Sequence, residues 1–444
     1  MATPAPSASE EVLSAAVPVT GDADDYDELM RLVGDRRFVL LGEATHGTHE
    51  FYRERARITK RLIEEKGFNA IAVEADWPDA YRVNRYVLGL SSDQSATQAL
   101  ADFQRFPAWM WRNRDVVGLV DWLRARNDAH AQHQTKARFY GLDLYSLRAS
   151  MEAVVAYLAS VDPEAAALAR ERYSCFDHVA GEGQRYGHAL TLNLALPCES
   201  EVVGQLVDLR RRASDLLARD GWVAEDEFFY AEQNARLVRN AEEYYREMYR
   251  ARVSSWNLRD GHMADTLAAL ASHLERQLGR ARVVVWEHNS HVGDARATQM
   301  GASGEFNVGQ LARTRWRDDC LLVGFTTHHG TVTAASDWGG PAERKRVRPA
   351  LSGSYEQLFH ASDLDCFWLP LGRASATLSE PRLERAIGVI YRPQTERASH
   401  WFQARLASQF DAVVHLDRTT AVEPLERTAF WDEGEPPETF PTGL

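Results

Sequence analysis

The sequence of 444 residues is poor in cysteine and has no long hydrophobic run. Its four cysteines lie far apart and form no CxxC pair, so neither a disulfide framework nor a zinc ribbon is predicted. We expect free thiols in a reducing compartment. No stretch predicts a membrane-spanning helix, and the N-terminal stretch MATPAPSASEEVLSAAVP lacks the basic start and apolar run of a signal peptide. These features predict a cytoplasmic protein with a flexible leader over residues 1–20. The cysteines are Cys175, Cys198, Cys320 and Cys366.

Positive charge is also in short supply. The chain carries 51 basic and 64 acidic residues, a formal net charge of −13. Such a balance disfavours nucleic acid or an anionic membrane surface as the main partner. The hydrophobic fraction of 45% is ample for a packed core. We therefore expect a globular protein that acts on a small molecule, and the composition leaves its oligomeric state open.

Several common catalytic motifs are missing. The sequence contains no GxSxG elbow, no GxxxxGK[ST] loop, no GxGxxG turn and no HExxH pair. A serine hydrolase of the α/β type, a phosphate-loop enzyme, a dinucleotide-binding protein and an HExxH metalloenzyme are therefore unsupported. Carboxylates and imidazoles remain as the catalytic inventory, which favours a general base acting on water or on a substrate group.

Polar side chains follow short apolar runs at several places along the chain. Runs of this kind, bounded by glycine, are typical of buried parallel strands. Because the carboxyl ends of parallel strands line the crevice where α/β proteins bind ligands, these polar groups are expected to converge. The runs are FVLLGEATHGTH (38–49), NAIAVE (69–74), RFYGLD (138–143), RVVVWEH (282–288) and LLVGFTT (321–327). The polar residues at or after their ends are Glu43, His46, His49, Glu74, Asp76, Asp143, Tyr145, His288, Asn289, His291, His328 and His329.

The alternation of strands and amphipathic helices predicts an α/β fold, a mostly parallel sheet flanked by helices. One such helix is expected over residues 49–66, ended by Gly67, and another begins after Asp76 as N-cap. Strand signals vanish between about residues 147 and 274 and return later, including at 387–391. We predict a first α/β segment over 21–147, a helical insertion over 148–276 roofing the active-site cleft, a second α/β segment over 277–426 and a C-terminal tail over 427–444.

Several segments together resemble the erythromycin esterase family. They are LGEATHGTHEFYRERARITKRLIEEKGFNAIAVEADWPDAYRVNRYV, FYGLDLYSL, NLRDGHMADTL, VVVWEHNSHVGDA, FTTHHGTV and YRPQTERASHWFQARL. The family includes macrolide-lactone hydrolases and homologues labelled succinoglycan biosynthesis proteins. The resemblance implies metal-independent hydrolysis of an ester or lactone by histidine-activated water. It leaves the natural substrate open and does not by itself imply antibiotic resistance.

The resemblance assigns the catalytic residues position by position: Glu43 and His46 in GEATHG, Glu74, His288 and His291 in HNSH, and Arg55 in the following helix. We expect His46 to be the general base, oriented by Glu43 three residues earlier, with the other acids and histidines positioning water or stabilising charge. Arg53 is an alternative to Arg55, because a helix beginning near Thr48 would place it closer to the face of His46. The roles of His328, His329, His400, Asp143 and Tyr145 stay open.

Two other functions compete with this hypothesis. EATH and HNSH each place two ligand-type residues three apart, so a zinc- or manganese-dependent hydrolase could use the same cluster. The scaffold could also serve a non-catalytic protein that binds a small molecule or haem. A pure binder has no need for so many titratable groups in one crevice, which favours the enzyme.

Overall fold

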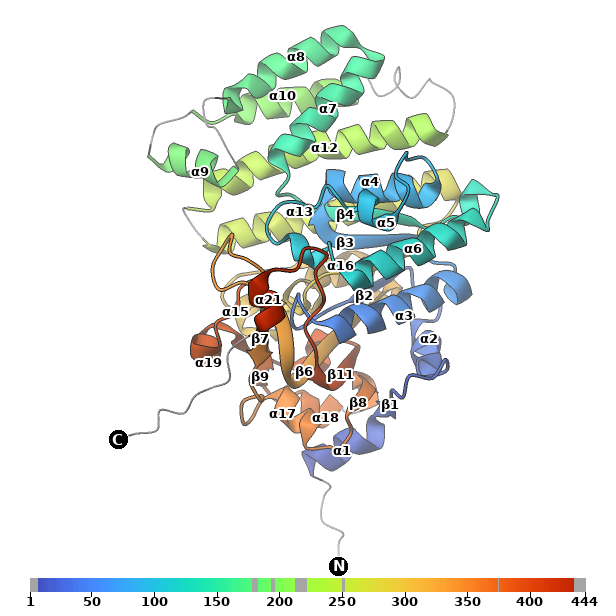
Figure 1. Cartoon of the computed structure of the whole chain (residues 1–444), viewed down its shortest axis with the longest axis vertical. Coiled ribbons are helices and arrows are strands. Elements are labelled where there is room, and N and C mark those ends of the chain that lie inside the picture. Colours follow the sequence, from blue (N-terminus) through green and yellow to red (C-terminus); the bar gives the residue numbers. More distant parts are fainter. Residues whose placement is uncertain are drawn as a thin grey trace, which may run out of the picture.

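The computed structural model describes residues 7–177, 183–192, 196–211, 222–249, 252–373 and 375–434. Its centre is a nine-stranded sheet in the order β1-β8-β11-β6-β2-β5-β3-β4, with β7 paired to β6 (Figure 1). The strands from β11 to β4 in this order run parallel, whereas β8, β1 and β7 are antiparallel to their neighbours. The predicted α/β fold with a mostly parallel sheet is confirmed. The bounds are β1 (Val17–Pro18), β2 (Phe38–Leu41), β3 (Ala70–Asp76), β4 (Arg138–Asp143), β5 (Val283–Trp286), β6 (Cys320–Ala334), β7 (Glu343–Val347), β8 (Cys366–Pro370) and β11 (Ala412–Thr419).

Both faces of the sheet are covered by helices, which explains why its central strands β2 and β5 are apolar throughout. Successive side chains of a strand point to opposite faces, so Leu40 and Val285 belong to one hydrophobic core and Leu41 and Trp286 to another. The first core includes side chains of α13 (Arg252–Leu278) and α16 (Val308–Trp316). The second includes side chains of α2 (Asp27–Val33), α3 (His49–Lys66), α4 (Trp77–Leu88) and α6 (Arg114–Asp128). A parallel sheet buried on both faces is the stable arrangement for such strands.

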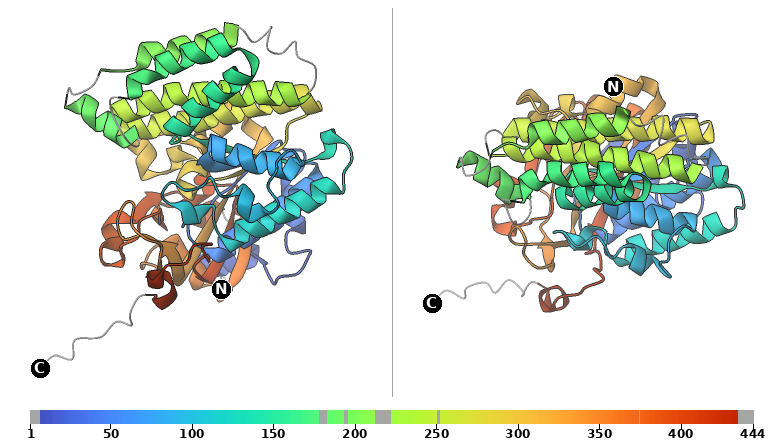
Figure 2. Two further views of the ribbon diagram at one scale, coloured as in Figure 1. Left: turned by 45° about the horizontal axis from the view of Figure 1, so that its top comes forward. Right: turned by 90° about the horizontal axis from the view of Figure 1, so that it is seen from above.

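The helical region predicted after residue 147 is present. Helices α7 (Leu147–Val161), α8 (Pro163–Tyr173), α9 (Gly183–Thr191), α10 (Glu199–Arg211) and α12 (Trp222–Glu247) stack beyond α13 at the β4 end of the molecule (Figures 1 and 2). Leu237, Val238, Ala241 and Tyr245 are buried on α12, at the helical spacing that the sequence shows. Among the described residues, no helix is long and apolar enough to cross a membrane.

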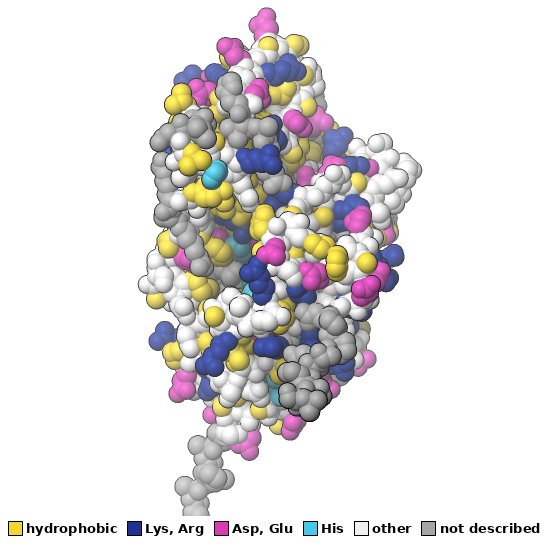
Figure 3. Space-filling view, turned by 60° about the vertical axis from the view of Figure 1, so that its left-hand side comes forward, with side chains coloured by type: hydrophobic (Ala, Val, Ile, Leu, Met, Phe, Trp, Pro, Cys, Tyr) yellow, Lys and Arg dark blue, Asp and Glu magenta, His cyan; other side chains and the backbone are white. Residues whose placement is uncertain are grey.

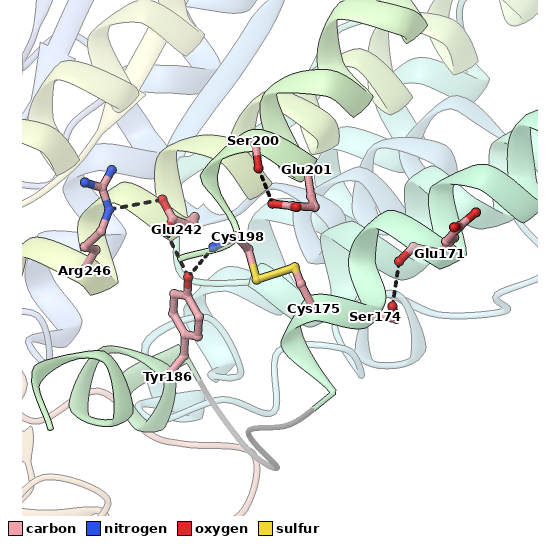
Figure 4. Close-up of a disulfide and its surroundings, with 9 residues drawn as sticks. All are labelled: Glu171, Ser174, Cys175, Tyr186, Cys198, Ser200, Glu201, Glu242 and Arg246. Atoms are coloured by element: carbon pink, nitrogen blue, oxygen red, sulfur yellow. Dashed lines mark hydrogen bonds and ion pairs between the residues drawn. A yellow bond between two sulfur atoms is a disulfide. The ribbon is translucent and has the colours of Figure 1, made fainter. Parts of the chain in front are cut away.

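The cysteine prediction is wrong for one pair. Cys175 and Cys198 form a disulfide with a Cα–Cα distance of 5.9 Å (Figure 4). The bridge joins the short helix η3 (Ser174–Phe176) to the residue before α10, and the backbone N–H of Cys198 donates to the Tyr186 hydroxyl at 2.9 Å. A disulfide persists in an oxidising environment, so the argument for a reducing compartment loses its basis. Sequence spacing could not reveal this pair, because only the packing of the helical region brings the two thiols together. Cys320 and Cys366 are free.

Two local predictions also differ from the structure. Within the predicted flexible leader, α1 (Ala8–Ala15) is a helix with a capping box formed by Ser7 and Glu10, and β1 pairs with β8. The stretch predicted as a strand over 387–391 forms only isolated bridges; β9 (Arg382–Arg385) and β10 (Trp401–Ala404) pair on either side of it. The remaining helices of four or more residues are α5 (Ala96–Ala99), α14 (Asn289–Val292), α15 (Gln299–Ala302), α17 (Tyr355–His360), α18 (Ser375–Leu378), α19 (Glu396–Ser399), α20 (Leu406–Gln409) and α21 (Ala429–Glu433).

The predicted glycine at the end of α3 is confirmed, whereas the predicted N-cap residue of α4 makes no capping hydrogen bond. Helix α3 ends at Lys66, and Gly67 follows in the left-handed conformation, with φ +66°. Asp76 is the N-cap residue of α4, but its side chain makes no capping hydrogen bond; its carboxylate accepts one from Arg105 Nε at 2.8 Å instead. Figure 3 shows one face of the molecule, on which acidic and basic side chains are interspersed.

Candidate active site

A cavity of about 560 Å³ lies at the C-terminal ends of the parallel strands. His46 follows β2, Glu74 lies near the end of β3, Asp143 ends β4 and His288 follows β5; all of them line the cavity. His291, on α14, lines it as well. Six residues were assigned to catalysis from the family resemblance, and four of them line this cavity. The other two, Glu43 and Arg55, lie behind His46. The helical region contributes to the wall through Trp256 and Arg259 of α13.

A buried chain of contacts runs from the cavity wall into the core. The Nδ1 atom of His46 lies 2.9 Å from Glu43 Oε1. Arg55 Nη2 donates to the other carboxylate oxygen of Glu43. A carboxylate only accepts hydrogen bonds, so the proton of neutral His46 lies on Nδ1 and its Nε2 carries the lone pair. No described residue forms a hydrogen bond with that Nε2 atom, which leaves it available to the cavity.

The structure distinguishes Arg55 from Arg53. Because α3 begins at His49, Arg55 lies on the same helix face as Tyr52 and points into the core, whereas Arg53 is about half exposed and pairs with Glu54. The Arg55 guanidinium packs over the rings of Tyr52 and Trp286, at 4.8 and 4.6 Å from their centroids. These rings hold the cation in place behind Glu43.

Two glycines of GEATHG explain why the motif has its sequence. A Cβ atom on Gly42 would lie 2.1 Å from Asn289 Oδ1, and one on Gly47 would lie 1.8 Å from the carbonyl oxygen of Thr333 in β6. Both contacts are too short for any side chain. The glycines therefore let the segment that carries Glu43 and His46 lie against its neighbours.

Arg259 holds two acids at the opposite wall. Its Nε and Nη2 donate to the two oxygens of Asp143 at 3.0 and 2.7 Å, and Nη2 also donates to Glu74 Oε1 at 2.7 Å. Burial raises the pKa of Glu74, but its interactions with His291, Arg259 and the backbone N–H of His288 outweigh burial and hold that pKa well below its usual value. Glu74 Oε2 accepts the backbone N–H of His288 at 2.9 Å. Both acids are therefore ionised and fixed in position.

The two histidines of HNSH have opposite electrostatic environments. Burial lowers the pKa of His291, but the carboxylates of Asp260 and Glu74 outweigh it and raise that pKa to about 9. Its Nδ1 lies 2.9 Å from Asp260 Oδ1, and its ring stacks on Trp256. Burial and the neighbouring His46 lower the pKa of His288 to about 3. At neutral pH the cavity thus holds one charged and one neutral imidazole from the same short motif.

Comparison with known proteins identifies the family of this chain. Residues 63–419 match the family model described as erythromycin esterase. The chain belongs to the erythromycin esterase family. It is 22% identical to YbfO of Bacillus subtilis (strain 168) over 430 residues, covering 89% of this chain and 86% of YbfO. It is also 22% identical to erythromycin esterase type II of Escherichia coli over 325 residues, covering 70% of this chain and 74% of that protein.

Solved structures agree with this membership at the level of the fold. A succinoglycan biosynthesis protein superposes with a TM-score of 0.74 at 20% identity, covering 94% of this chain and 97% of the other. A mutant of the erythromycin esterase EreC in its open conformation superposes with a TM-score of 0.66 at 19% identity, covering 92% and 96%. Membership in the erythromycin esterase family supports a hydrolase activity in general terms and leaves the substrate undefined.

Sequence reasoning missed several residues of the site. Arg259 and Asp260 were not singled out, although they lie in NLRDGHMADTL, one of the segments that carry the family resemblance. Of the residues whose role was open, Asp143, Tyr145 and His400 line the cavity. His328 and His329 are not among its lining residues, and neither is His49, which instead pairs with Asp115 at 2.8 Å. The feature of the sequence that could have pointed to Arg259 is its adjacent opposite charge, Asp260, within the segment that forms α13.

The cavity also holds an acid that is neutral near pH 7. Burial, Asp76 and Asp102 raise the pKa of Asp79 to about 8. Asp79 lines the cavity next to Arg105, which pairs with Asp76. Among the described residues, three candidate metal-ligand atoms lie within 4.8 Å of one another elsewhere, at His328, His329 and Asp417.

Proposed function

We propose that this member of the erythromycin esterase family hydrolyses a carboxylic ester or lactone with water activated by His46. The observation that carries the proposal is the buried chain from Arg55 through Glu43 to His46 Nδ1, which leaves the basic Nε2 atom facing the cavity. In the reaction, Nε2 takes a proton from water while the water oxygen bonds to the carbonyl carbon. The Glu43 carboxylate stabilises the imidazolium that forms.

The second half of the reaction needs positive charge near the carbonyl oxygen. Arg259 and its neighbour His291 supply it, and both lie against Glu74, at 2.7 and 3.4 Å from Oε1. The tetrahedral intermediate carries its negative charge on that oxygen, so preorganised cations lower the barrier. When the intermediate collapses, the carbon–oxygen bond to the alcohol breaks and the imidazolium of His46 returns its proton to the leaving alkoxide. The products are a carboxylic acid and an alcohol.

His288 has a different task in this scheme. The backbone N–H of Ser290 donates to its Nδ1 atom at 3.2 Å, which leaves the proton of the neutral ring on Nε2. Its ring centroid lies 4.9 Å from that of His46. Because its pKa is about 3, His288 does not compete with His46 for the proton. Its Nε2 atom is buried and makes no hydrogen bond with a described residue, so we assign His288 the task of holding the His46 ring in position.

The cavity walls support a substrate with an apolar body. Aromatic and aliphatic side chains from separate loops line it, namely Phe103, Met110, Trp111, Trp338, Val389 and Trp401. A volume of about 560 Å³ lies in the range of small-molecule sites. About half of the lining residues are apolar and about half are charged or polar, so apolar surface and converging charged groups share the cavity. An uncharged ester or lactone ring fits this combination better than a highly charged substrate.

The test compares His46→Asn with His49→Asn on a panel of p-nitrophenyl esters and lactones. Asparagine keeps a similar size but cannot accept the proton, so kcat should fall by about a hundredfold to ten-thousandfold in His46→Asn. His49 lies three residues further on and outside the cavity, so its variant should keep kcat within about twofold. Near-normal turnover in His46→Asn would remove His46 from the role of base. Melting temperatures of both variants separate loss of chemistry from loss of fold.

A further inference from the structure

A second group of histidines surrounds a single carboxylate away from the cavity. Asp417 on β11 lies among His328 and His329 of β6, His415 of β11 and His360 at the end of α17; we call these five residues the Asp417 cluster. It lies on β6 and β11, which pair in parallel, close to the point where that pairing ends at Gly330 and Thr419. The proposed hydrolysis uses none of its residues.

The distances in the Asp417 cluster are those of converging ligand atoms. The Nδ1 atoms of His328 and His329 lie 3.0 Å apart, and His329 Nδ1 lies 3.9 Å from Asp417 Oδ2. One ligand atom from each of His328, His329 and Asp417 lies within 4.8 Å of the others. Side chains adjacent on a regular strand point to opposite faces, so the convergence of two neighbouring rings is unusual. Gly330 follows them with φ +143°.

The carboxylate is held from two sides. His360 Nδ1 lies 2.8 Å from Asp417 Oδ1, and His415 Nε2 lies 3.5 Å from the same oxygen. The Nδ1 atom of His415 contacts the Thr326 hydroxyl at 2.9 Å. These contacts occupy Oδ1 and leave Oδ2 directed toward His329. Partners of this kind, which fix a ligand without touching the ion, are the usual supports of metal sites.

The charge balance of the Asp417 cluster also favours a cation. No arginine or lysine pairs with Asp417 within the described ranges. Metal ions bind neutral imidazole and ionised carboxylate. The cluster thus offers two nitrogen lone pairs and one negative charge without a fixed cation to neutralise it.

We infer that His328, His329 and Asp417 form a binding site for a divalent transition-metal ion, best matched by zinc. Nitrogen and carboxylate ligands about 2.0–2.2 Å from a tetrahedral zinc ion lie roughly 3.3 Å from one another. The separations of 3.0 and 3.9 Å lie on either side of that value and require shifts of a few tenths of an ångström. Three protein ligands leave the fourth position to water. His329 and His360 are 36% and 44% exposed, so the ion can enter from solvent.

The inference is independent of the proposed hydrolysis, and its test uses the full chain after treatment with EDTA and dialysis. Calorimetric titration with Zn²⁺ should show one equivalent bound, and Co²⁺ should give the visible absorption of a tetrahedral nitrogen–oxygen site. His329→Ala and Asp417→Asn should each weaken binding by about a hundredfold or more, because each removes a ligand. His360→Ala should weaken it by about tenfold to hundredfold through the orientation of Asp417.

Two further variants decide where any bound ion lies. His49→Ala, which removes a histidine outside both sites, and His46→Asn, which removes one from the cavity, should leave the Zn²⁺ affinity unchanged. The inference is overturned if the wild-type chain binds no Zn²⁺, if His329→Ala binds it as tightly as wild type, or if His46→Asn abolishes binding. Unfolding curves of the metal-free variants show whether each is folded. If Asp417→Asn does not fold, the partly exposed position His329 decides the outcome.

Discussion

Two groups of histidines lie along one sheet, the first after β2 and β5 and the second on β6 and β11, and they are partnered in different ways. In the cavity, His46 and His291 each have a carboxylate of their own, and arginines hold the remaining acids. In the Asp417 cluster, several imidazoles share one carboxylate and no guanidinium takes part. A histidine with a private acid has a defined tautomer, which suits proton transfer. Histidines that share an acid keep lone pairs, which suits a metal ion.

The largest effect on stability is expected where the cavity network is cut. Arg259→Met removes the partner of two buried acids, Glu74 and Asp143, and leaves both charges uncompensated. The free energy of unfolding should fall by about 3–5 kcal/mol. Urea unfolding at pH 7 measures this loss. The control Arg31→Met breaks an exposed pair with Glu28 and should cost less than about 1 kcal/mol. Equal losses of unfolding free energy in both variants would mean that the contacts of Arg259 stabilise the fold no more than an exposed ion pair does.

Glu43→Gln should separate the orienting acid from the base itself. The amide oxygen still accepts the proton on His46 Nδ1, but the negative charge that stabilises the imidazolium is gone. We expect kcat to fall about tenfold to hundredfold, less than in His46→Asn. Steady-state kinetics on the best ester of the panel measures it. Asp115→Asn removes the acid partner of His49 outside the cavity and should leave kcat unchanged. A larger loss in Glu43→Gln than in His46→Asn would contradict the order of roles.

The stability of the folded chain should depend on pH through His291. Its pKa is raised from 6.5 to about 9 on folding, so the stabilisation is complete below pH 6.5 and disappears as the pH rises through about 9. Over this window the wild type should lose up to about 3 kcal/mol more than His291→Gln. Urea unfolding of both proteins at several pH values gives the difference, in which contributions of other groups cancel. Parallel pH profiles of the two proteins would show that His291 is not protonated in the folded state.

The smallest effect is expected in the metal-free Asp417 cluster. His360→Ala removes a side chain that is 44% exposed and one of several partners of Asp417. Without metal, the free energy of unfolding should change by less than about 0.5 kcal/mol. The same variant should lose part of the stabilisation that Zn²⁺ adds to the wild type. A large destabilisation without metal would mean that the cluster serves the fold, as the cavity network does.

The parts of the fold that were predicted correctly depend on local patterns. The run before Glu43 and the helix ended by Gly67 are recognisable because an apolar strand and a left-handed glycine leave direct marks in the sequence. Glu43 and His46 are three residues apart, so their contact is local as well. The choice of Arg55 over Arg53 depended on where α3 begins. One residue of error there turns a helix by about a quarter of a turn.

The sequence alone determined the α/β class, the family and the strand ends at which the cavity lies, because these follow from strand periodicity and from motifs within short segments. Only the tertiary structure decided which distant groups complete the site. Arg259 lies 185 residues from Glu74 and 116 from Asp143 and meets them through the packing of α13 against the sheet. Cys175 and Cys198 also meet through tertiary packing, in their case within the helical region. Contacts of this kind depend on how helices stack, and the stacking depends on the summed burial of many side chains rather than on any single motif.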